Sequence, residues 1–286
     1  MKVVLFFFSG TGNTWKITEY IKSYLIELGH DVINYSIERK DLNWEDLIPK
    51  ILSESDIIGI GYPVYGSDIP IIMKDWVKDI LCIHSKEREN NPRAFVYDTM
   101  AMFSGDTPLI MKRRLKKCGF RVKQAINIRA LCNIPQMPRL MVWEEEKQNE
   151  IFNKAELKCK KLVDKVLENK KWVMRRDPFT RLVAIIQRVS LRTEINLARK
   201  MFKFDMDKCT LCGICVDNCP IDNLSIEETE DKPKISYGPD CIVCMRCFNS
   251  CPQDAIIVMK RSRDTEKYRR FRGQIPGFNF SKVKKG

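Results

Sequence analysis

The feature that most constrains this chain is a repeated cysteine pattern in its last third. The runs CTLCGICVDNCP at 209–220 and CIVCMRCFNSCP at 241–252 share the spacing C-x2-C-x2-C-x3-C-P, and they begin 32 residues apart (241 minus 209). Such self-similarity predicts two copies of one structural unit. Gaps of two residues wrap a tight loop around a metal group so that three thiolates converge on it, while the displaced fourth cysteine reaches the group held by the other copy. We therefore predict a small metal-dependent module with two interlocked sites.

Two kinds of metal site compete for these cysteines. Zinc takes four thiolates from two C-x2-C pairs, and it does not account for two triplets that are each followed by a displaced cysteine and a proline. The spacing favours two 4Fe-4S clusters, and it resembles that of the two-cluster bacterial-type ferredoxins over about 55 residues. One predicted cluster has the ligands Cys209, Cys212, Cys215 and Cys251, and the other has Cys241, Cys244, Cys247 and Cys219.

The first 170 residues alternate apolar runs with amphipathic stretches, which is typical of a parallel α/β sheet covered by helices on both faces. Strands are predicted at Lys2–Phe8, Asp31–Ser36, Asp56–Gly61, Arg93–Asp98 and Gln124–Arg129. Helices are predicted at Thr14–Leu28, Trp44–Leu52 with an interruption at Pro49, Ile71–Leu81, Thr107–Cys118 and Glu144–Glu168. Right-handed crossovers and five strands favour a doubly wound sheet of order 2-1-3-4-5.

A glycine loop follows the first predicted strand and leads directly into a helix. Its residues are Ser9, Gly10, Thr11, Gly12, Asn13 and Thr14. Successive N–H groups at a helix start hold a phosphate, and the hydroxyl groups add donors. The loop lacks the third glycine of the Rossmann pattern and the lysine of a Walker loop. It resembles the phosphate loop of flavodoxins, and this resemblance, which extends over about 165 residues through the strand order, implies FMN as a cofactor.

Two later loops are expected at the same edge of the sheet, because ligands of such folds bind outside the carboxyl ends of the strands. The loop after the third strand contains Pro63, Val64, Tyr65 and Gly66, and the loop after the fourth contains Phe103, Ser104, Gly105 and Asp106. The flavodoxin resemblance implies that these loops enclose the flavin ring. Tyr65 is as compatible with a surface aromatic as with a residue that touches the flavin. Phe103 is as compatible with a core residue as with one that touches the flavin.

The order of the parts resembles the flavodoxin-ferredoxin fusion proteins of anaerobes. We predict a flavodoxin-like FMN domain at 1–170, a basic helical linker at 171–204, a small α+β two-cluster ferredoxin domain at 205–259 and a basic tail at 260–286. The resemblance implies electron transfer between FMN and two 4Fe-4S clusters on behalf of redox partner proteins. No acid-base pair for catalysis is visible. A flavin-dependent reductase of a small acceptor, or an iron-sulfur regulatory protein that binds nucleic acid, are the alternatives.

Charge and the remaining cysteines bear on partners and compartment. Segment 171–204 has nine Lys/Arg against two Asp/Glu, the tail has ten against two, and 205–259 has four against ten. The linker is therefore expected to pack between the domains and complement the acidic module, with an anionic membrane surface as the alternative. The tail is expected to be solvated or to clasp the domains rather than to bind nucleic acid. Cys82, Cys118, Cys132 and Cys159 are expected to be buried small apolar residues. No transmembrane segment is expected, and a reducing cytoplasm fits best.

Overall fold

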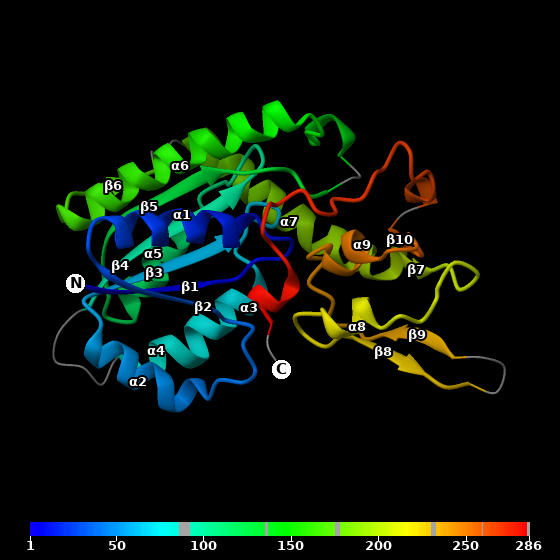
Figure 1. Cartoon of the computed structure of the whole chain (residues 1–286), viewed down its shortest axis with the longest axis horizontal. Helices are drawn as coiled ribbons and strands as arrows, with labels where there is room; N and C mark the ends of the chain where they lie inside the picture. The colour runs from blue at the N-terminus through cyan, green and yellow to red at the C-terminus, as the bar shows by residue number, and fades with distance from the viewer. Residues whose placement is uncertain (86–91, 135–136, 175–177, 230–232, 259, 285–286) are drawn as a thin grey trace.

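The computed structural model describes residues 1–284 apart from 86–91, 135–136, 175–177, 230–232 and 259, and it describes the side chains of the remaining residues except 191–201 and 261. Figure 1 shows a larger α/β part that contains the N-terminus and a smaller module to one side of it. We call residues 1–173 the sheet domain and residues 202–258 the C-terminal module.

The sheet domain is built on a parallel sheet of strand order β2-β1-β3-β4-β5-β6. The strands are β1 (Lys2–Phe7), β2 (Asp31–Ser36), β3 (Ile57–Pro63), β4 (Arg93–Met100), β5 (Arg121–Arg129) and β6 (Trp172–Val173). The predicted fold class, a flavodoxin-like doubly wound sheet of order 2-1-3-4-5, is confirmed. The strand β6 adds a sixth member at the edge, and its two residues are too few to give a sequence pattern.

Helices cover both faces of this sheet (Figure 1). One face carries α1 (Asn13–Glu27) and α6 (Glu145–Leu167); the other carries α2 (Trp44–Glu54), α3 (Ile71–Trp76), α4 (Cys82–Ser85) and α5 (Thr107–Lys117). A π-helical turn over Val77–Leu81 joins α3 to α4. Because β1 is apolar at nearly every position, it packs against both layers at once.

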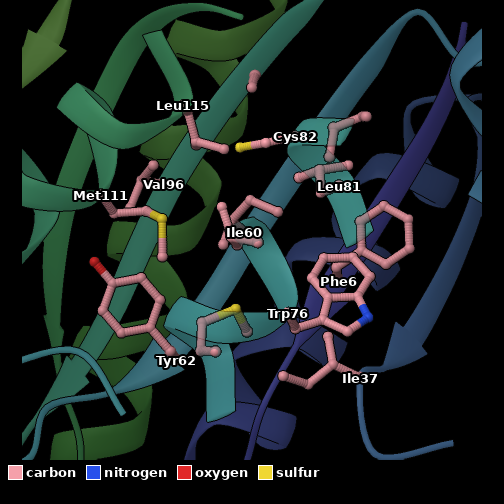
Figure 2. Close-up of a cluster of buried hydrophobic side chains, with 14 of the residues drawn as sticks. Phe6, Ile37, Ile60, Tyr62, Trp76, Leu81, Cys82, Val96, Met111 and Leu115 are labelled. Carbon is pink, nitrogen blue, oxygen red and sulfur yellow. The ribbon is translucent and has the colours of Figure 1, made fainter. Parts of the chain in front are cut away.

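The core on the α2–α5 face is shown in Figure 2. Phe6 lies against Trp76 with ring centroids 4.9 Å apart, and Ile60, Val96, Met111 and Leu115 fill the space beside them. This packing explains why α2 continues through Pro49, where the sequence predicts an interruption. Burial of Ile48, Ile51 and Leu52 offsets the backbone hydrogen bond that the proline removes.

Two of the scattered cysteines are paired. Cys82, at the start of α4, forms a disulfide with Cys118, which follows α5, and their Cα atoms are 4.9 Å apart. The expectation that both are simple buried apolar residues is therefore wrong, although both are buried. Cys132 and Cys159 are free and buried, as expected.

The linker is helical over α7 (Pro178–Met201), and it runs from the sheet domain to the C-terminal module (Figure 1). Among the described residues, no helix is long and apolar enough to cross a lipid bilayer. The side chains of residues 191–201, at the end of this helix, lie outside the described part of the structure. The described half of α7 contacts the loops after β3 and β4. Its Arg188 pairs with Asp106 of the sheet domain, although the expectation was that the linker charge would complement the acidic C-terminal module.

The C-terminal module contains two short antiparallel ladders and two short helices. β7 (Phe202–Phe204) pairs with β10 (Ile256–Val258), and β8 (Leu224–Glu227) pairs with β9 (Lys234–Tyr237). The helices α8 (Ile214–Asp217) and α9 (Arg246–Ser250) lie within the two cysteine runs. Its apolar core is small and is centred on Phe202, Phe248 and Ile256, so the cysteine sites lie close to its centre. Beyond it come two short 3-10 turns, Lys260–Arg263 and Phe280–Lys282; a third, Pro138–Leu140, precedes α6.

Candidate cofactor-binding site

The C-terminal module gathers the eight cysteines of the repeat around two separate cavities. One cavity, which we call the inner cavity, is lined by Cys219, Cys241, Cys244 and Cys247. The other, which we call the outer cavity, is lined by Cys209, Cys212, Cys215 and Cys251. In each set, three cysteines come from one run and the fourth comes from the other run, which is the grouping that the spacing predicts.

The backbone repeats as the cysteines do. Positive φ angles occur at Leu211 (53°) and at Val243 (54°), and again at Gly213 (74°) and at Met245 (61°). The members of each pair are 32 residues apart in the sequence. A left-handed conformation costs about 1–2 kcal/mol in a residue other than glycine, so its presence in a β-branched valine indicates a backbone fixed by its surroundings. Such turns aim successive N–H groups into the loop, where they favour bound negative charge.

Backbone N–H groups also point at cysteine sulfurs. Asn223 donates to the Sγ of Cys219 at 3.2 Å, and Ala255 donates to the Sγ of Cys251 at 3.3 Å. Hydrogen bonds of this kind are one of the ways in which a protein sets the reduction potential of an iron-sulfur cluster. Both acceptors are the displaced fourth cysteines of their runs, so each half of the module makes the same hydrogen bond at the equivalent position.

A third cavity lies at the carboxyl ends of the strands in the sheet domain. It is a cleft that opens to solvent. Its lining includes Ser9, Gly10, Thr11, Asn13 and Thr14 from the glycine loop and Pro63, Val64 and Tyr65 from the loop after β3. These eight residues were all predicted from the sequence to bind one ligand.

The glycine loop has the geometry of an anion site. The Ser9 hydroxyl accepts from the N–H groups of Gly12 (3.2 Å) and Trp15 (3.1 Å), and this contact closes the loop on the start of α1. The hydroxyls of Thr14 and Thr99 are hydrogen-bonded at 2.8 Å, and the Asn133 side-chain amide donates to the Thr11 hydroxyl at 2.7 Å. Hydroxyl and amide groups thus surround the cleft end of the loop, as a phosphate monoester requires.

Tyr65 supplies a polar group that has no protein partner in the described structure. Its hydroxyl oxygen is buried and makes no hydrogen bond. Burial raises the pKa of this phenol well above its ordinary value, so the hydroxyl stays protonated and can donate. A buried donor without a partner is costly, and a ligand acceptor in the cleft would satisfy it. A ligand with polar groups, such as FMN, would supply that acceptor.

Six predicted site residues do not line this cleft. Gly12 instead faces Phe278 of the tail, and Gly66 lies outside the lining. Phe103, Ser104, Gly105 and Asp106 also lie outside it, because α7 docks on their loop. A methyl group on Gly105 would come within 2.8 Å of the Ala184 side chain, and Arg188 pairs with Asp106 at 2.6 Å. The end of β4, at Thr99 and Met100, and the adjoining Ala101 line the cleft in their place.

The cleft and the inner cavity share a wall. Val243, Cys244 and Met245 line the cleft, and Cys244 and Met245 line the inner cavity as well. A Cβ on Gly10 would lie 3.2 Å from the Cys244 carbonyl oxygen, so the glycine loop and the second cysteine run are in direct contact. The sheet domain and the C-terminal module thus build one composite site.

Arg246 fixes this contact. Its Nε donates to the Gly10 carbonyl at 2.8 Å, and its Nη2 donates to the Ser9 carbonyl at 2.8 Å. Both terminal nitrogens also bond the Glu38 carboxylate, at 2.6 and 2.8 Å, and Nη1 reaches the Asn218 carbonyl at 3.0 Å. The Arg246 and Glu38 side chains are 0% and 1% exposed. The guanidinium therefore neutralises its partner while it holds the back of the glycine loop.

The tail clasps both parts of the chain. Phe278 packs on Trp15 with ring centroids 5.5 Å apart, and Lys284 donates to the Cys219 carbonyl at 2.9 Å. Tyr268 and Phe271 are buried. These aromatic residues of the tail thus pack within the protein. This agrees with the expected clasping role.

Comparisons with known proteins agree with this geometry. Residues 208–257 match the 4Fe-4S dicluster domain family. A 56-residue stretch is 41% identical to a ferredoxin of Methanothermococcus thermolithotrophicus, of which it covers 90%, while it makes up 19% of this chain. The chain belongs to the ferredoxin family through this module.

Two further comparisons are more limited. The ferredoxin module is 33% identical over 52 residues to an archaeal-type glutamate synthase [NADPH] of Dehalococcoides mccartyi; the match covers 18% of this chain and 10% of that protein. The sheet domain superposes on a Megasphaera elsdenii flavodoxin with a TM-score of 0.40 and 21% identity, covering 58% of this chain and 98% of the flavodoxin. The 4Fe-4S ferredoxin module indicates a role in electron transfer.

Sequence reasoning missed two parts of the composite site. The loop after β5 contributes Leu131, Cys132 and Asn133 to the cleft, although it carries no recognisable motif. Arg246 was also missed. The one signal that could have found it is a charged residue between two cluster cysteines, at the position where the first run has Ile214.

Proposed function

We propose that this chain is an electron-transfer protein that binds FMN in the cleft and one 4Fe-4S cluster in each cavity of the ferredoxin module, and that it links redox partner proteins in anaerobic metabolism. The observation that carries the proposal is the shared wall. Residues 243–245 line the cleft, and the same backbone supplies ligands to the inner cavity. When bound, FMN would exchange two electrons and each cluster one, so the pair would divide or combine electron pairs.

Different residues of the cleft would contact different parts of FMN. The N–H groups and hydroxyls of Ser9, Thr11 and Thr14 would bind the phosphate without a compensating lysine. Tyr65 would donate its unpartnered hydroxyl to the ligand. Val243 and Met245 would exclude water from the side of the cleft that faces the module.

Arg246 would keep the two binding sites at a fixed separation. Electron transfer requires that donor and acceptor stay close, and the contacts of Arg246 with Ser9, Gly10 and Glu38 tie the second cysteine run to the glycine loop. Separation of the two parts would break the four hydrogen bonds that Arg246 makes to Ser9, Gly10 and Glu38 at once. The module is therefore expected to stay docked while electrons pass.

The outer cavity is the expected exchange point with partner proteins. Its ligand Cys212 is exposed, whereas Cys219 and Cys244 of the inner cavity are buried. The ferredoxin segment 205–259 carries a net charge of −6, from four basic and ten acidic residues. A partner with a basic surface would be steered to it by charge, and this attraction weakens as salt rises.

The test is anaerobic purification followed by cofactor counting and titration. We expect about eight iron and eight sulfide per chain from two 4Fe-4S clusters, and binding of one FMN with loss of its free fluorescence. Reduction of the clusters should then bleach the flavin absorbance at a rate that does not depend on protein concentration. The proposal fails if FMN does not bind, or if the flavin is reduced only in second-order collisions between molecules.

A control separates electron relay from reduction of a small acceptor. The variant Cys212→Ser alters the outer cavity and leaves the cleft lining intact. We expect it to keep FMN and intramolecular flavin reduction but to lose fast exchange with a partner ferredoxin or reductase. If its turnover with small quinone-like acceptors, and with no protein partner, equals that of the natural chain, the reductase alternative is the better description.

A further inference from the structure

The helix α7 carries a row of large apolar side chains that face solvent. They lie within three turns of the helix and recur at helical spacing. Their exposed fractions are 74% for Phe179, 57% for Leu182, 43% for Ile185, 59% for Ile186 and 66% for Val189. We call these five residues the α7 stripe. Single exposed apolar residues are ordinary, but a contiguous row of this kind marks an interaction surface.

The opposite side of α7 is fixed to the sheet domain. Ala184 is fully buried against the loop that contains Gly105. Arg188 donates to the Asp106 carboxylate at 2.6 Å and to the Ser67 carbonyl at 3.0 Å, and Gln187 is hydrogen-bonded to the Ser67 hydroxyl. The helix cannot rotate its stripe inward without breaking these bonds, so the stripe faces outward in the folded protein.

The charge of the segment selects the partner. Residues 171–204 contain nine Lys/Arg and two Asp/Glu, and the exposed Arg181 adjoins the stripe within the same turns. A second copy of this chain would present the same positive segment and repel the first. An exposed apolar face flanked by basic residues is the pattern of a helix that lies in the interface of an anionic bilayer.

We propose that α7 binds the surface of anionic lipid membranes, with the α7 stripe inserted among the acyl chains and Arg181 at the headgroups. The helix lies parallel to the membrane and does not cross it. The sheet domain remains in water, held to the helix by Arg188 and Ala184.

The test uses the full chain with its cofactors, prepared without oxygen, in flotation with lipid vesicles. We expect binding to phosphatidylcholine vesicles that contain about 30 mol% phosphatidylglycerol, and at least about tenfold weaker binding to pure phosphatidylcholine, because each cation at an anionic surface adds about fivefold. Binding should weaken as salt is added. Equal binding to both vesicles, or none to either, would overturn the proposal.

Two variants localise the effect. Leu182→Glu with Ile186→Glu should reduce vesicle binding by about tenfold or more, because charge is excluded from the acyl region. The matched control is Leu157→Glu, which changes an apolar residue on α6 that is 67% exposed; it should bind vesicles like the natural chain. Cofactor absorbance and ultraviolet dichroism check that each variant is folded. If the double variant binds as well as the control, the stripe is not the membrane contact.

A sedimentation experiment without lipid tests whether a second copy of the chain, and not a membrane, covers the stripe. A chain that is monomeric with and without the double substitution is the expected result. A dimer that the double substitution dissociates would assign the stripe to a second copy and overturn the lipid proposal. Binding of an acidic protein at physiological salt with no vesicle binding would do the same.

Discussion

The two cysteine runs have the same spacing and the same backbone, but they have different neighbours. Both use left-handed residues at equivalent positions, and both receive an N–H hydrogen bond at the fourth cysteine. The first run surrounds a cavity whose ligand Cys212 is exposed. The second run is pressed against the glycine loop through Arg246, where the first run has Ile214. The repeat thus determines how the cysteines surround each cavity. Arg246, at the position of Ile214, holds the second run against the glycine loop.

Burial follows the same division. It raises the pKa of the Cys244 thiol to about 12 and that of the Cys215 thiol to about 11. Both sites are desolvated, but Cys219 and Cys244 of the inner cavity are buried, whereas Cys212 of the outer cavity is exposed. A cluster in the inner cavity would therefore be shielded from solvent, while one in the outer cavity would be reachable.

The largest expected difference between the runs concerns loss of a ligand. Cys244→Ser should remove the cluster of the inner cavity and weaken FMN binding by about tenfold or more, because residue 244 forms part of the cleft wall. Cys212→Ser should remove the cluster of the outer cavity and leave FMN affinity unchanged. Iron analysis and fluorescence titration measure both quantities. Equal losses of FMN affinity in the two variants would show that the runs are not functionally distinct.

The next largest effect concerns the residue that differs between the runs. Arg246→Met leaves the Glu38 carboxylate buried without its partner, and it should destabilise the protein by about 3–5 kcal/mol. Ile214→Met changes the matched position of the first run with little change in volume and should cost less than about 1.5 kcal/mol. Denaturant midpoints of the cofactor-loaded proteins give the comparison.

A double variant sharpens this result. Adding Glu38→Met to Arg246→Met removes the orphaned charge, so stability should recover in part although FMN affinity stays low. Recovery of both properties would mean that Arg246 acts only through the charge of Glu38. No recovery of either would mean that its bonds to the Ser9 and Gly10 carbonyls dominate.

A smaller contrast comes from two glycines. A methyl group in Gly10→Ala would lie 2.6 Å from the Tyr65 hydroxyl and 3.2 Å from the Cys244 carbonyl, so the Tyr65 side chain must shift and the Cys244 backbone must give slightly, at a cost of about 1–3 kcal/mol. In Gly213→Ala the nearest atom is 3.5 Å away, and the φ of 74° sets the cost at about 1 kcal/mol. Only the first variant should weaken FMN binding. A normal FMN affinity in Gly10→Ala would argue against a tight junction.

The smallest expected effect separates a partly buried contact of the inner cavity from an exposed one. Lys284 is 14% exposed and bonds both Asp222 and the Cys219 carbonyl, so Lys284→Met should cost about 1 kcal/mol. Lys40 pairs with the same Asp222 but is 52% exposed, and Lys40→Met should cost less than about 0.5 kcal/mol. Thermal midpoints at low and high salt measure both. An equal loss at high salt would show that the tail contact adds nothing beyond a surface pair.

Much of the fold could be predicted because it depends on local patterns. The apolar runs of β1, β3 and β4 and the periodicity of α1 are set by neighbouring residues, and connection rules then leave few strand orders. The cysteine grouping follows from a spacing that has a specific chemical use. The glycine loop could be predicted for the same reason, because its function depends on adjacent N–H groups.

The parts that were missed depend on residues far apart in the sequence. Cys82 and Cys118 are 36 residues apart, and nothing local shows that their helices meet. Arg246 contacts residues more than 200 positions earlier, so its role appears only once the module has docked. The misplacement of Phe103–Asp106 has the same origin, since α7 takes that loop as its docking surface.

The tail has a consequence for how the protein is made. Phe278 touches the glycine loop, and Val283 is fully buried in the same apolar cluster as Trp15, although both follow the two modules in the chain. Synthesis proceeds from the N-terminus, so the sheet domain can fold before these residues exist. The junction between the sheet domain and the C-terminal module is therefore completed last, after both cysteine runs have emerged.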